Sequence, residues 1–261
     1  MSSITKLYKP PVDFFITLFL WFYFIFGYIF FYLPVLLLLS PFIGNRETKF
    51  QNMNHYFYRV FFWMLNVLTP GLSITIGKEV KKIRSSVVIA NHRSYLDPIL
   101  LISMYPKHKT FVKGIFFKIP IMRWVMKSGG YIPFMPRGEY SDYIEESIKN
   151  MAGFLKSGGN LFIFPEGRRS RDGSLGKFQK GAFTIACNNR VPLHVIYINN
   201  TDRLFTPGKF FFNTCIKNTI SVDLLGSLDP SKNTALEMRE KAIMLYKNRM
   251  KENNLKNTLS R

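Results

Sequence analysis

The sequence has few cysteines and few acidic residues, and both shortages exclude classes of protein. Its two cysteines, Cys187 and Cys215, are too few for a disulfide framework in a chain of 261 residues. Because there is no CxxC pair and no Cys/His cluster, we expect a reducing compartment and no structural metal. Only 16 Asp and Glu oppose 36 Lys and Arg, so the formal net charge is +20. This excess predicts an anionic partner, which on composition alone is nucleic acid, acidic lipid or a phosphorylated small molecule.

Charge of either sign is absent from one long stretch near the N-terminus. No charged residue occurs between Phe14 and Asn45, and most of this stretch is apolar or aromatic. As a helix, about 30 residues would extend roughly 45 Å, more than the ~30 Å that a bilayer core requires. The stretch is also too long for a cleaved signal peptide, and Pro34 predicts a kink or break within it.

A second apolar stretch from Tyr56 to Leu68 follows a polar hinge, and we expect it to be interfacial or to pack on a core. Residues 1–69 are therefore predicted to be a helical membrane anchor. A single span and a monotopic helix hairpin both fit, and so does a buried helical pair in a soluble protein. Basic residues flank the first stretch on both sides, so the positive-inside rule gives no orientation.

Beyond residue 70 the pattern changes to short β-branched or aromatic runs that alternate with helical segments, which predicts an α/β catalytic domain over residues 70–261. Helical spacing is expected over Ser141–Lys156, and a capping box at Thr234 and Glu237 predicts a closing helix to about Lys251. The expected strands are Ser73–Ile76, Ser86–Ala90, Thr110–Val112, Tyr131–Phe134, Leu161–Phe164, Leu193–Ile198 and Thr219–Leu224.

One histidine stands where active sites of α/β proteins form. One residue, Asn91, separates His92 from the end of the expected strand Ser86–Ala90. Asp97 lies five residues after His92. If the chain turns between them, the carboxylate can fix the tautomer of the imidazole and leave the other ring nitrogen free to accept a proton. A surface histidine beside a helix-capping aspartate is the alternative interpretation. The remaining histidines lie in helix, loop and strand patterns typical of structural or solvated positions.

Two further strand ends carry groups suited to phosphate. The strand ending at Pro165 is followed by Glu166, Gly167 and Arg168, in which glycine permits close backbone approach and arginine suits a phosphate. A third strand end leads through two prolines to Arg137. A His–Asp pair beside arginines predicts base chemistry next to a bound phosphate.

These segments resemble the glycerolipid acyltransferases, the group of 1-acylglycerol-3-phosphate acyltransferases. The stretch from Asn91 to Asp97, NHRSYLD, is similar to their NHx4D motif. FPEGRRS, ending at Ser170, is similar to their FPEGTRS motif, with Arg169 in place of threonine. The block that ends at Arg137 is similar to the arginine-bearing block between the two, with a spacing one residue longer. The resemblance covers roughly residues 70–225.

The resemblance implies a mixed sheet flanked by helices, and acyl transfer from a thioester to a glycerol hydroxyl without a covalent acyl-enzyme. His92, oriented by Asp97, would act as the base, while Arg168 and Arg137 would hold the acceptor phosphate. Gly167 would let the backbone approach the ligand, and Glu166 would accept an acceptor hydroxyl or orient an arginine. Gly-x-Ser-x-Gly, the mark of a serine nucleophile, is absent from the sequence.

The expected partners are a lysophospholipid acceptor, membrane lipid, and acyl-CoA or acyl carrier protein as donor, with no nucleic acid, metal or cofactor. The product would be phosphatidic acid, and the catalytic domain is expected on the cytoplasmic face of the inner (plasma) membrane. The same chemistry on glycerol-3-phosphate, another lysophospholipid or a lyso-aminolipid is one alternative. A membrane-tethered binder of anionic ligands without enzymatic activity is a more distant one.

Overall fold

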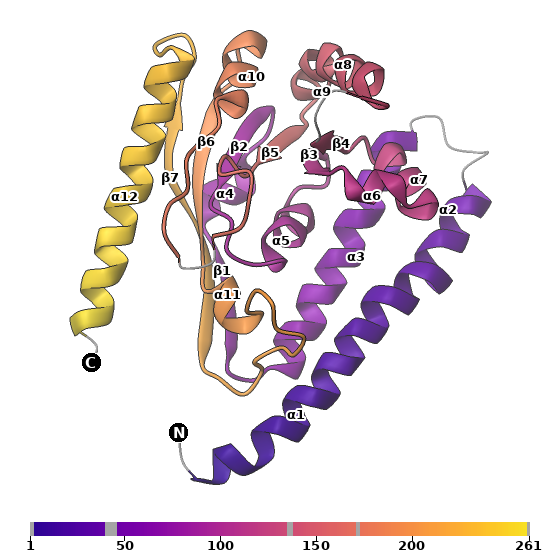
Figure 1. Ribbon diagram of the computed structural model, residues 1–261, viewed down its shortest axis with the longest axis vertical. Helices are drawn as coiled ribbons and strands as arrows, with labels where there is room; N and C mark the ends of the chain where they lie inside the picture. Colours follow the sequence, from indigo (N-terminus) through magenta and orange to yellow (C-terminus); the bar gives the residue numbers. More distant parts are fainter. Residues whose placement is uncertain (1–2, 40–45, 135–137, 171–172, 260–261) are drawn as a thin grey trace.

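The computed structural model describes residues 3–39, 46–134, 138–170 and 173–259. Within them, seven strands form one sheet in the order β1-β7-β6-β2-β5-β3-β4 (Figure 1). Only β6 and β7 are antiparallel neighbours, and every other neighbouring pair is parallel. The predicted mixed α/β sheet is therefore confirmed. The strands are β1 Leu72–Ile76, β2 Ser86–Ala90, β3 His108–Lys113, β4 Ile132–Phe134, β5 Asn160–Ile163, β6 Leu193–Asn199 and β7 Asn218–Leu228.

Helices cover both faces of the sheet, and the alternation of side chains along β2 feeds both cores. Val88 and Ala90 join one core with residues of α3 and α5, whereas Val87 and Ile89 join the other with residues of α9, α10 and α12. Figure 1 shows α10 and α12 on one side of the sheet and α3 and α5 on the other. All residues of β2 are buried, and its mostly apolar sequence is typical of a central parallel strand that is covered on both faces.

The helices differ from the prediction at two places. The closing helix, predicted to end at about Lys251, continues to Leu259. The predicted helix over Ser141–Lys156 is two helices, which meet at Asn150. The capping box is confirmed, because the Glu237 carboxylate accepts the Thr234 N–H at 2.7 Å and the Thr234 hydroxyl accepts the Glu237 N–H at 3.3 Å. The helices of the catalytic part are α4 Lys78–Lys82, α5 Leu96–Met104, α6 Ile115–Lys118, α7 Pro120–Ser128, α8 Ser141–Lys149, α9 Met151–Lys156, α10 Gly181–Asn189, α11 Thr201–Leu204 and α12 Ala235–Leu259.

The N-terminal apolar stretch is helical from Ser3 to Leu39. It consists of α1 Ser3–Phe22, the π-helical η1 Tyr23–Tyr32 and α2 Leu33–Leu39, so the hydrogen-bonding pattern changes beside Pro34 without ending the helix. The next helix, α3 Arg46–Leu68, lies alongside and includes the charged residues of the predicted hinge that follow Asn45. Residues 40–45, which join the two, lie outside the described residues.

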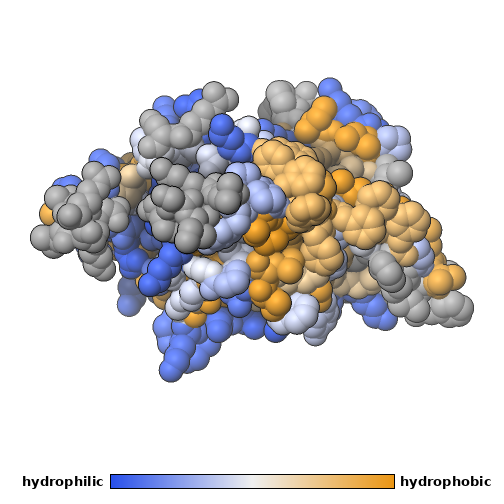
Figure 2. Space-filling model, turned by 90° about the horizontal axis from the view of Figure 1, so that it is seen from below, coloured by the Kyte–Doolittle hydropathy of each residue, from blue (hydrophilic) through white to orange (hydrophobic). Residues whose placement is uncertain are grey.

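One face of the N-terminal helix is an exposed apolar stripe. Its members recur at helical spacing and are Phe15, Leu18, Phe19, Phe22, Ile25, Phe26, Ile29 and Phe30. Tyr8–Phe30 is long and apolar enough to cross a membrane, and most of it is not buried. The first helix is therefore not buried inside the structure, as the alternative of a buried helical pair requires. Seen from below, apolar atoms gather on the half of the molecule that contains α1 and α3, and hydrophilic atoms on the α12 half (Figure 2).

Candidate active site

The candidate site lies at the edge of the sheet where three parallel strands end. β2 lies between β5 and β6 and runs parallel to both, so their carboxyl ends meet at one edge, hereafter the carboxyl edge. His92 comes two residues after β2, Glu166 three residues after β5, and Thr201 two residues after β6. Positions about 35 to 110 residues apart in the sequence thus converge on the histidine.

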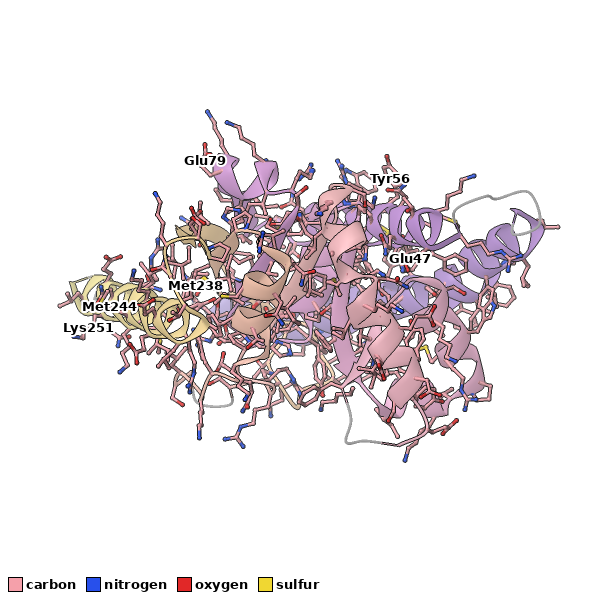
Figure 3. All side chains as sticks on the ribbon, turned by 90° about the horizontal axis from the view of Figure 1, so that it is seen from above. Glu47, Tyr56, Glu79, Met238, Met244 and Lys251 are labelled. Atoms are coloured by element: carbon pink, nitrogen blue, oxygen red, sulfur yellow. The ribbon has the colours of Figure 1, made fainter. Side chains whose placement is uncertain are left out.

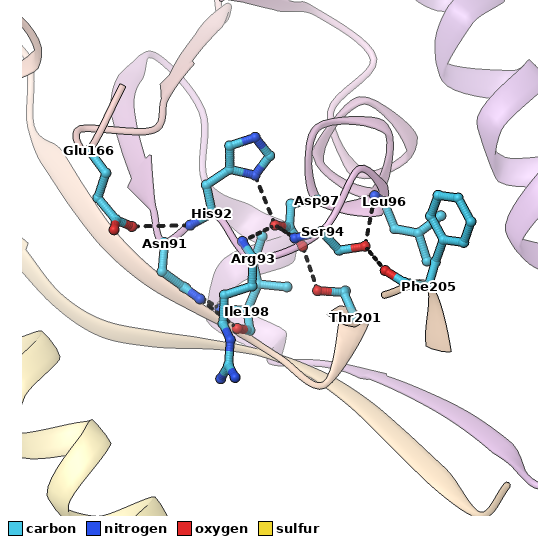
Figure 4. Close-up of polar contacts among 10 residues, drawn as sticks. All are labelled: Asn91, His92, Arg93, Ser94, Leu96, Asp97, Glu166, Ile198, Thr201 and Phe205. Atoms are coloured by element: carbon cyan, nitrogen blue, oxygen red, sulfur yellow. Dashed lines mark hydrogen bonds and ion pairs between the residues drawn. The ribbon is translucent and has the colours of Figure 1, made fainter. Parts of the chain in front are cut away.

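The predicted His–Asp pair is formed. The Nδ1 atom of His92 lies 3.0 Å from Oδ2 of Asp97 (Figure 4). A carboxylate only accepts hydrogen bonds, so Nδ1 carries the proton and Nε2 is left with a free lone pair. The His92 side chain is 17% exposed and that of Asp97 is fully buried. This arrangement equips Nε2 to accept a proton from a bound hydroxyl group.

Asp97 is held by more than the histidine. Its Oδ2 atom also accepts the backbone N–H groups of Arg93 at 2.7 Å and Ser94 at 2.8 Å, which closes the turn before α5. Its other oxygen, Oδ1, accepts the Thr201 hydroxyl at 2.6 Å. The carboxylate is buried but fully supplied with donors, so its orientation toward His92 is fixed.

Glu166 contacts the same turn from the β5 side of β2, whereas Thr201 contacts it from the β6 side. Its Oε1 accepts the backbone N–H of His92 at 3.3 Å, and its Oε2 accepts that of Gly176 at 2.9 Å. Burial raises the pKa of the Glu166 carboxyl above its ordinary value, although these two hydrogen bonds oppose the shift. Both oxygens are thus engaged with the backbone, while the predicted contact of Glu166 with the acceptor stays a prediction.

The face of the His92 ring is covered by an aromatic side chain. The ring of Phe164 stacks on it with centroids 4.2 Å apart and an angle of 23° between the planes. The backbone N–H of Ser170 donates to the carbonyl of His92 at 2.8 Å, which ties the segment after β5 to the histidine. Stacking and backbone contacts together restrict the ring to one orientation.

The other three histidines have structural partners, as the sequence predicted. His55 pairs with the carbonyl of Ile102 at 3.1 Å, and His194 with the hydroxyl of Ser227 at 2.7 Å. His108 is completely buried between the Tyr105 carbonyl at 2.6 Å and the Tyr131 hydroxyl at 2.8 Å. Burial lowers the pKa of His108 to about 3, so it is neutral at physiological pH.

The predicted phosphate-binding residues fall partly within the described structure. Gly167 has φ +68°, a conformation that favours glycine, and open space lies beside its Cα. Arg168 is exposed next to it. The guanidinium of Arg169, the residue that departs from the family motif, lies 3.5 Å above the Tyr95 ring. Arg137 lies outside the described residues.

Sequence reasoning missed three contributors to this edge. Thr201 and Phe164 contact Asp97 and His92, and Lys113 ends β3 at the carboxyl edge with an exposed side chain. The signal for Thr201 was its place three residues after the end of the expected strand Leu193–Ile198. That signal becomes useful only once β6 is known to be the parallel neighbour of β2.

A buried carboxylate that orients a histidine at the carboxyl edge of a mixed sheet is an arrangement suited to general-base catalysis. Residues 73–199 match the model of the Acyltransferase family. Over those residues the chain is similar to this family.

Curated relatives carry the name 1-acyl-sn-glycerol-3-phosphate acyltransferase. The chloroplastic BAT2 protein of Brassica napus is 37% identical over 47% of this chain, and the chloroplastic LPAT1 protein of Arabidopsis thaliana is 31% identical over 68%. The Saccharomyces cerevisiae enzyme is 30% identical over 70% of the chain. The chain spans 35%, 50% and 60% of the lengths of these three relatives.

The fold has a solved counterpart. The crystal structure of the 1-acyl-sn-glycerophosphate acyltransferase PlsC from Thermotoga maritima superimposes with a TM-score of 0.71, covering 94% of this chain and 98% of the other. At 22% sequence identity this likeness establishes the common fold.

Proposed function

We propose that the chain transfers a fatty acyl group from acyl-CoA or acyl carrier protein to the free hydroxyl of 1-acyl-glycerol-3-phosphate, forming phosphatidic acid. The observation that carries the proposal is the His92–Asp97 pair, held at 3.0 Å at the carboxyl edge. The names of the curated relatives support the choice of acceptor.

The residues support a direct transfer. Nε2 of His92 takes the proton of the acceptor hydroxyl as its oxygen attacks the carbonyl carbon of the thioester. The carbon–sulfur bond then breaks, and the imidazolium returns the proton to the departing thiolate. Asp97 stabilises the imidazolium between these steps, and each step is balanced without a covalent acyl-enzyme.

Thr201 gives the first test of this chemistry. Replacing Thr201 by Val removes the hydrogen bond to Oδ1 of Asp97 with little change in volume. We expect kcat to fall about tenfold with KM unchanged, because hydrogen bonds to charged groups contribute about 1.5–3 kcal/mol. Steady-state kinetics of Thr201→Val and Thr201→Ser would measure this, and Ser should restore most of the rate. Thr184→Val, which removes an exposed hydroxyl from α10, is the matched control. Equal rates for Val and Ser would contradict a role in orienting Asp97.

Cationic side chains beside the base support a phosphate-bearing acceptor. Arg168 is exposed after β5, and Lys113 is exposed at the end of the neighbouring β3. We propose that Arg168 holds the acceptor phosphate. Arg137 is proposed as its partner from the sequence alone.

A panel of acceptors tests the substrate. Labelled acyl-CoA would be offered with lysophosphatidic acid, glycerol-3-phosphate, a neutral-headgroup lysophospholipid, a lyso-aminolipid and monoacylglycerol. We expect the highest kcat/KM for lysophosphatidic acid. In Arg168→Ala this value should fall about 10²-fold through KM, because charge-assisted pairs are roughly twice as strong as neutral hydrogen bonds. The rate with monoacylglycerol should be unchanged. A wild-type preference for an acceptor without phosphate would contradict the proposal.

The N-terminal helices support binding to the membrane. The location of the catalytic domain on the cytoplasmic face is proposed from the sequence alone. We propose that α1 lies along one leaflet rather than crossing the bilayer. Asp13 and Thr17 of α1 are buried against residues 212–214 of the catalytic part, which would have to enter the bilayer with a spanning helix. The division of the chain into an anchor, residues 1–69, and a catalytic domain, residues 70–261, is part of the same proposal.

A further inference from the structure

An exposed aromatic tip projects from the catalytic part beside α1. Phe210 and Phe211 lie in the loop between α11 and β7 and are 54% and 48% exposed. Their rings pack edge to face with centroids 5.2 Å apart. Gly208, with φ +83°, turns the chain just before them. Two adjacent exposed phenylalanines are unfavourable in water and mark a contact surface.

The loop is fastened to α1 by polar contacts. Oδ1 of Asp13 accepts the backbone N–H of Thr214 at 2.8 Å and its hydroxyl at 2.6 Å, and the hydroxyl of Thr17 accepts the backbone N–H of Phe212 at 2.9 Å. Together with the ion pair to Lys9 one turn earlier in the helix, these bonds explain why α1 carries a buried aspartate. They also hold the tip at a fixed position on the helix.

The tip is continuous with the apolar surface of α1. The ring of Phe210 stacks on that of Trp21 with centroids 5.9 Å apart, and the ring of Phe211 lies 6.1 Å from that of Phe14. Phe14 and its neighbour Phe15 belong to the exposed side of the helix. The aromatic tip and the apolar stripe therefore border one another on the same side of the molecule.

We infer that Phe210 and Phe211 enter the leaflet on which α1 lies, with Arg203 and Lys209 against its anionic headgroups. Both cations are exposed in or beside the loop, and an aromatic tip with basic neighbours is the composition of an interfacial anchor. The inference rests on the proposal above that α1 lies along one leaflet. The partner that the aromatic tip would bind is a lipid surface with negative charge.

The same loop reaches the active site. The carbonyl of Phe205 accepts the Ser94 hydroxyl at 2.8 Å, within the turn that joins His92 to Asp97. Phe205 stacks on Phe212 with centroids 4.5 Å apart. Insertion of the tip would thus fix the distance between His92 and the leaflet that holds a lysophospholipid acceptor.

Labelling measures insertion without requiring activity. In a full-length Cys187→Ser/Cys215→Ser background, a nitroxide label would be attached to Phe211→Cys or to Met244→Cys. Met244 is a matched control because it is 56% exposed on α12, at the opposite end of the molecule from α3 (Figure 3). On vesicles of phosphatidylcholine and phosphatidylglycerol, we expect the label at 211 to be accessible to oxygen and shielded from a nickel chelate. The label at 244 should behave in the opposite way.

If the chain binds the vesicles but the label at 211 is accessible to the nickel chelate, the inference is overturned, while the proposed position of α1 on the membrane is not. A chain that stays in solution would overturn both. A shielded label in a chain without acyl transfer would support the inference and overturn the proposed function.

Kinetics give an independent test. In Phe210→Ser/Phe211→Ser, KM for lysophosphatidic acid in vesicles should rise at least about tenfold, because burial of apolar surface is lost. The kcat value, and KM for a short-chain acceptor in detergent micelles, should not change. Met244→Ser should behave as wild type. Equal losses in vesicles and micelles, or no loss in either, would overturn the inference.

Discussion

We expect His92→Ala to lower kcat by about 10²–10⁴-fold, the usual contribution of a positioned general base. No other group is held in the same way at this edge among the described residues: the remaining histidines pair with carbonyl or hydroxyl groups elsewhere. The fold should survive, because the His92 ring is partly exposed and its backbone contacts with Glu166 and Ser170 do not need the side chain.

The measurement is the initial rate of phosphatidic acid formation on vesicles, together with thermal unfolding and membrane recovery. His194→Ala is the matched control, because it removes a histidine from β6 that bonds only to Ser227 among the contacts described. It should keep nearly full activity. A His92→Ala enzyme that works at the wild-type rate would exclude His92 as the base.

The second large effect is expected from Asp97→Asn, which should lower kcat by on the order of 10⁴-fold. The amide keeps the size of the side chain but presents only one accepting oxygen. If its NH₂ group faces His92, the ring must accept at Nδ1 and carry its proton on Nε2, the wrong tautomer for a base. Unlike His92→Ala, this orientation also leaves the backbone N–H groups of Arg93 and Ser94, which both donate to Oδ2, without an acceptor.

Stability should therefore separate the two variants. An unsatisfied buried hydrogen-bonding group costs about 1–3 kcal/mol, so Asp97→Asn should unfold at a lower temperature than His92→Ala. Asp223→Asn is the matched control, since it breaks an ion pair with Arg249 near the surface, worth about 1 kcal/mol or less. Loss of activity in Asp97→Asn with wild-type rates in Asp223→Asn would support the orientation of His92 by Asp97. Retention of activity in Asp97→Asn would contradict it.

The strands could be predicted because their local pattern is strong. β2 is a run of apolar residues with no charge, typical of a strand buried on both faces, and it lies where the sequence predicted. The helical stretch over Ser141–Lys156 has the right spacing, but the interruption at Asn150 depends on how α8 and α9 pack, which spacing does not report. The order of the strands likewise has no local signal.

The contacts of the candidate site likewise fall into those that could be predicted from the sequence and those that could not. Asn91 to Asp97 is one short turn, so the pairing of His92 with Asp97 could be predicted from spacing and motif alone. Glu166 was identified as a residue of the site, but not as the acceptor of the His92 amide. Thr201 was missed, because its contact with Asp97 spans 104 positions in the sequence.

By itself, the sequence determined the apolar N-terminal helix, the seven strands and the His–Asp pair, since each depends on residues close together in the chain. Only the tertiary structure decided what surrounds that pair, because β5 and β6 flank β2 and bring Glu166 and Thr201 to it from either side. It also decided how the apolar helix meets the catalytic part. Asp13 pairs with Lys9 one turn earlier in its own helix, but its burial is explained only when the loop that ends at Thr214 supplies two further hydrogen-bond donors.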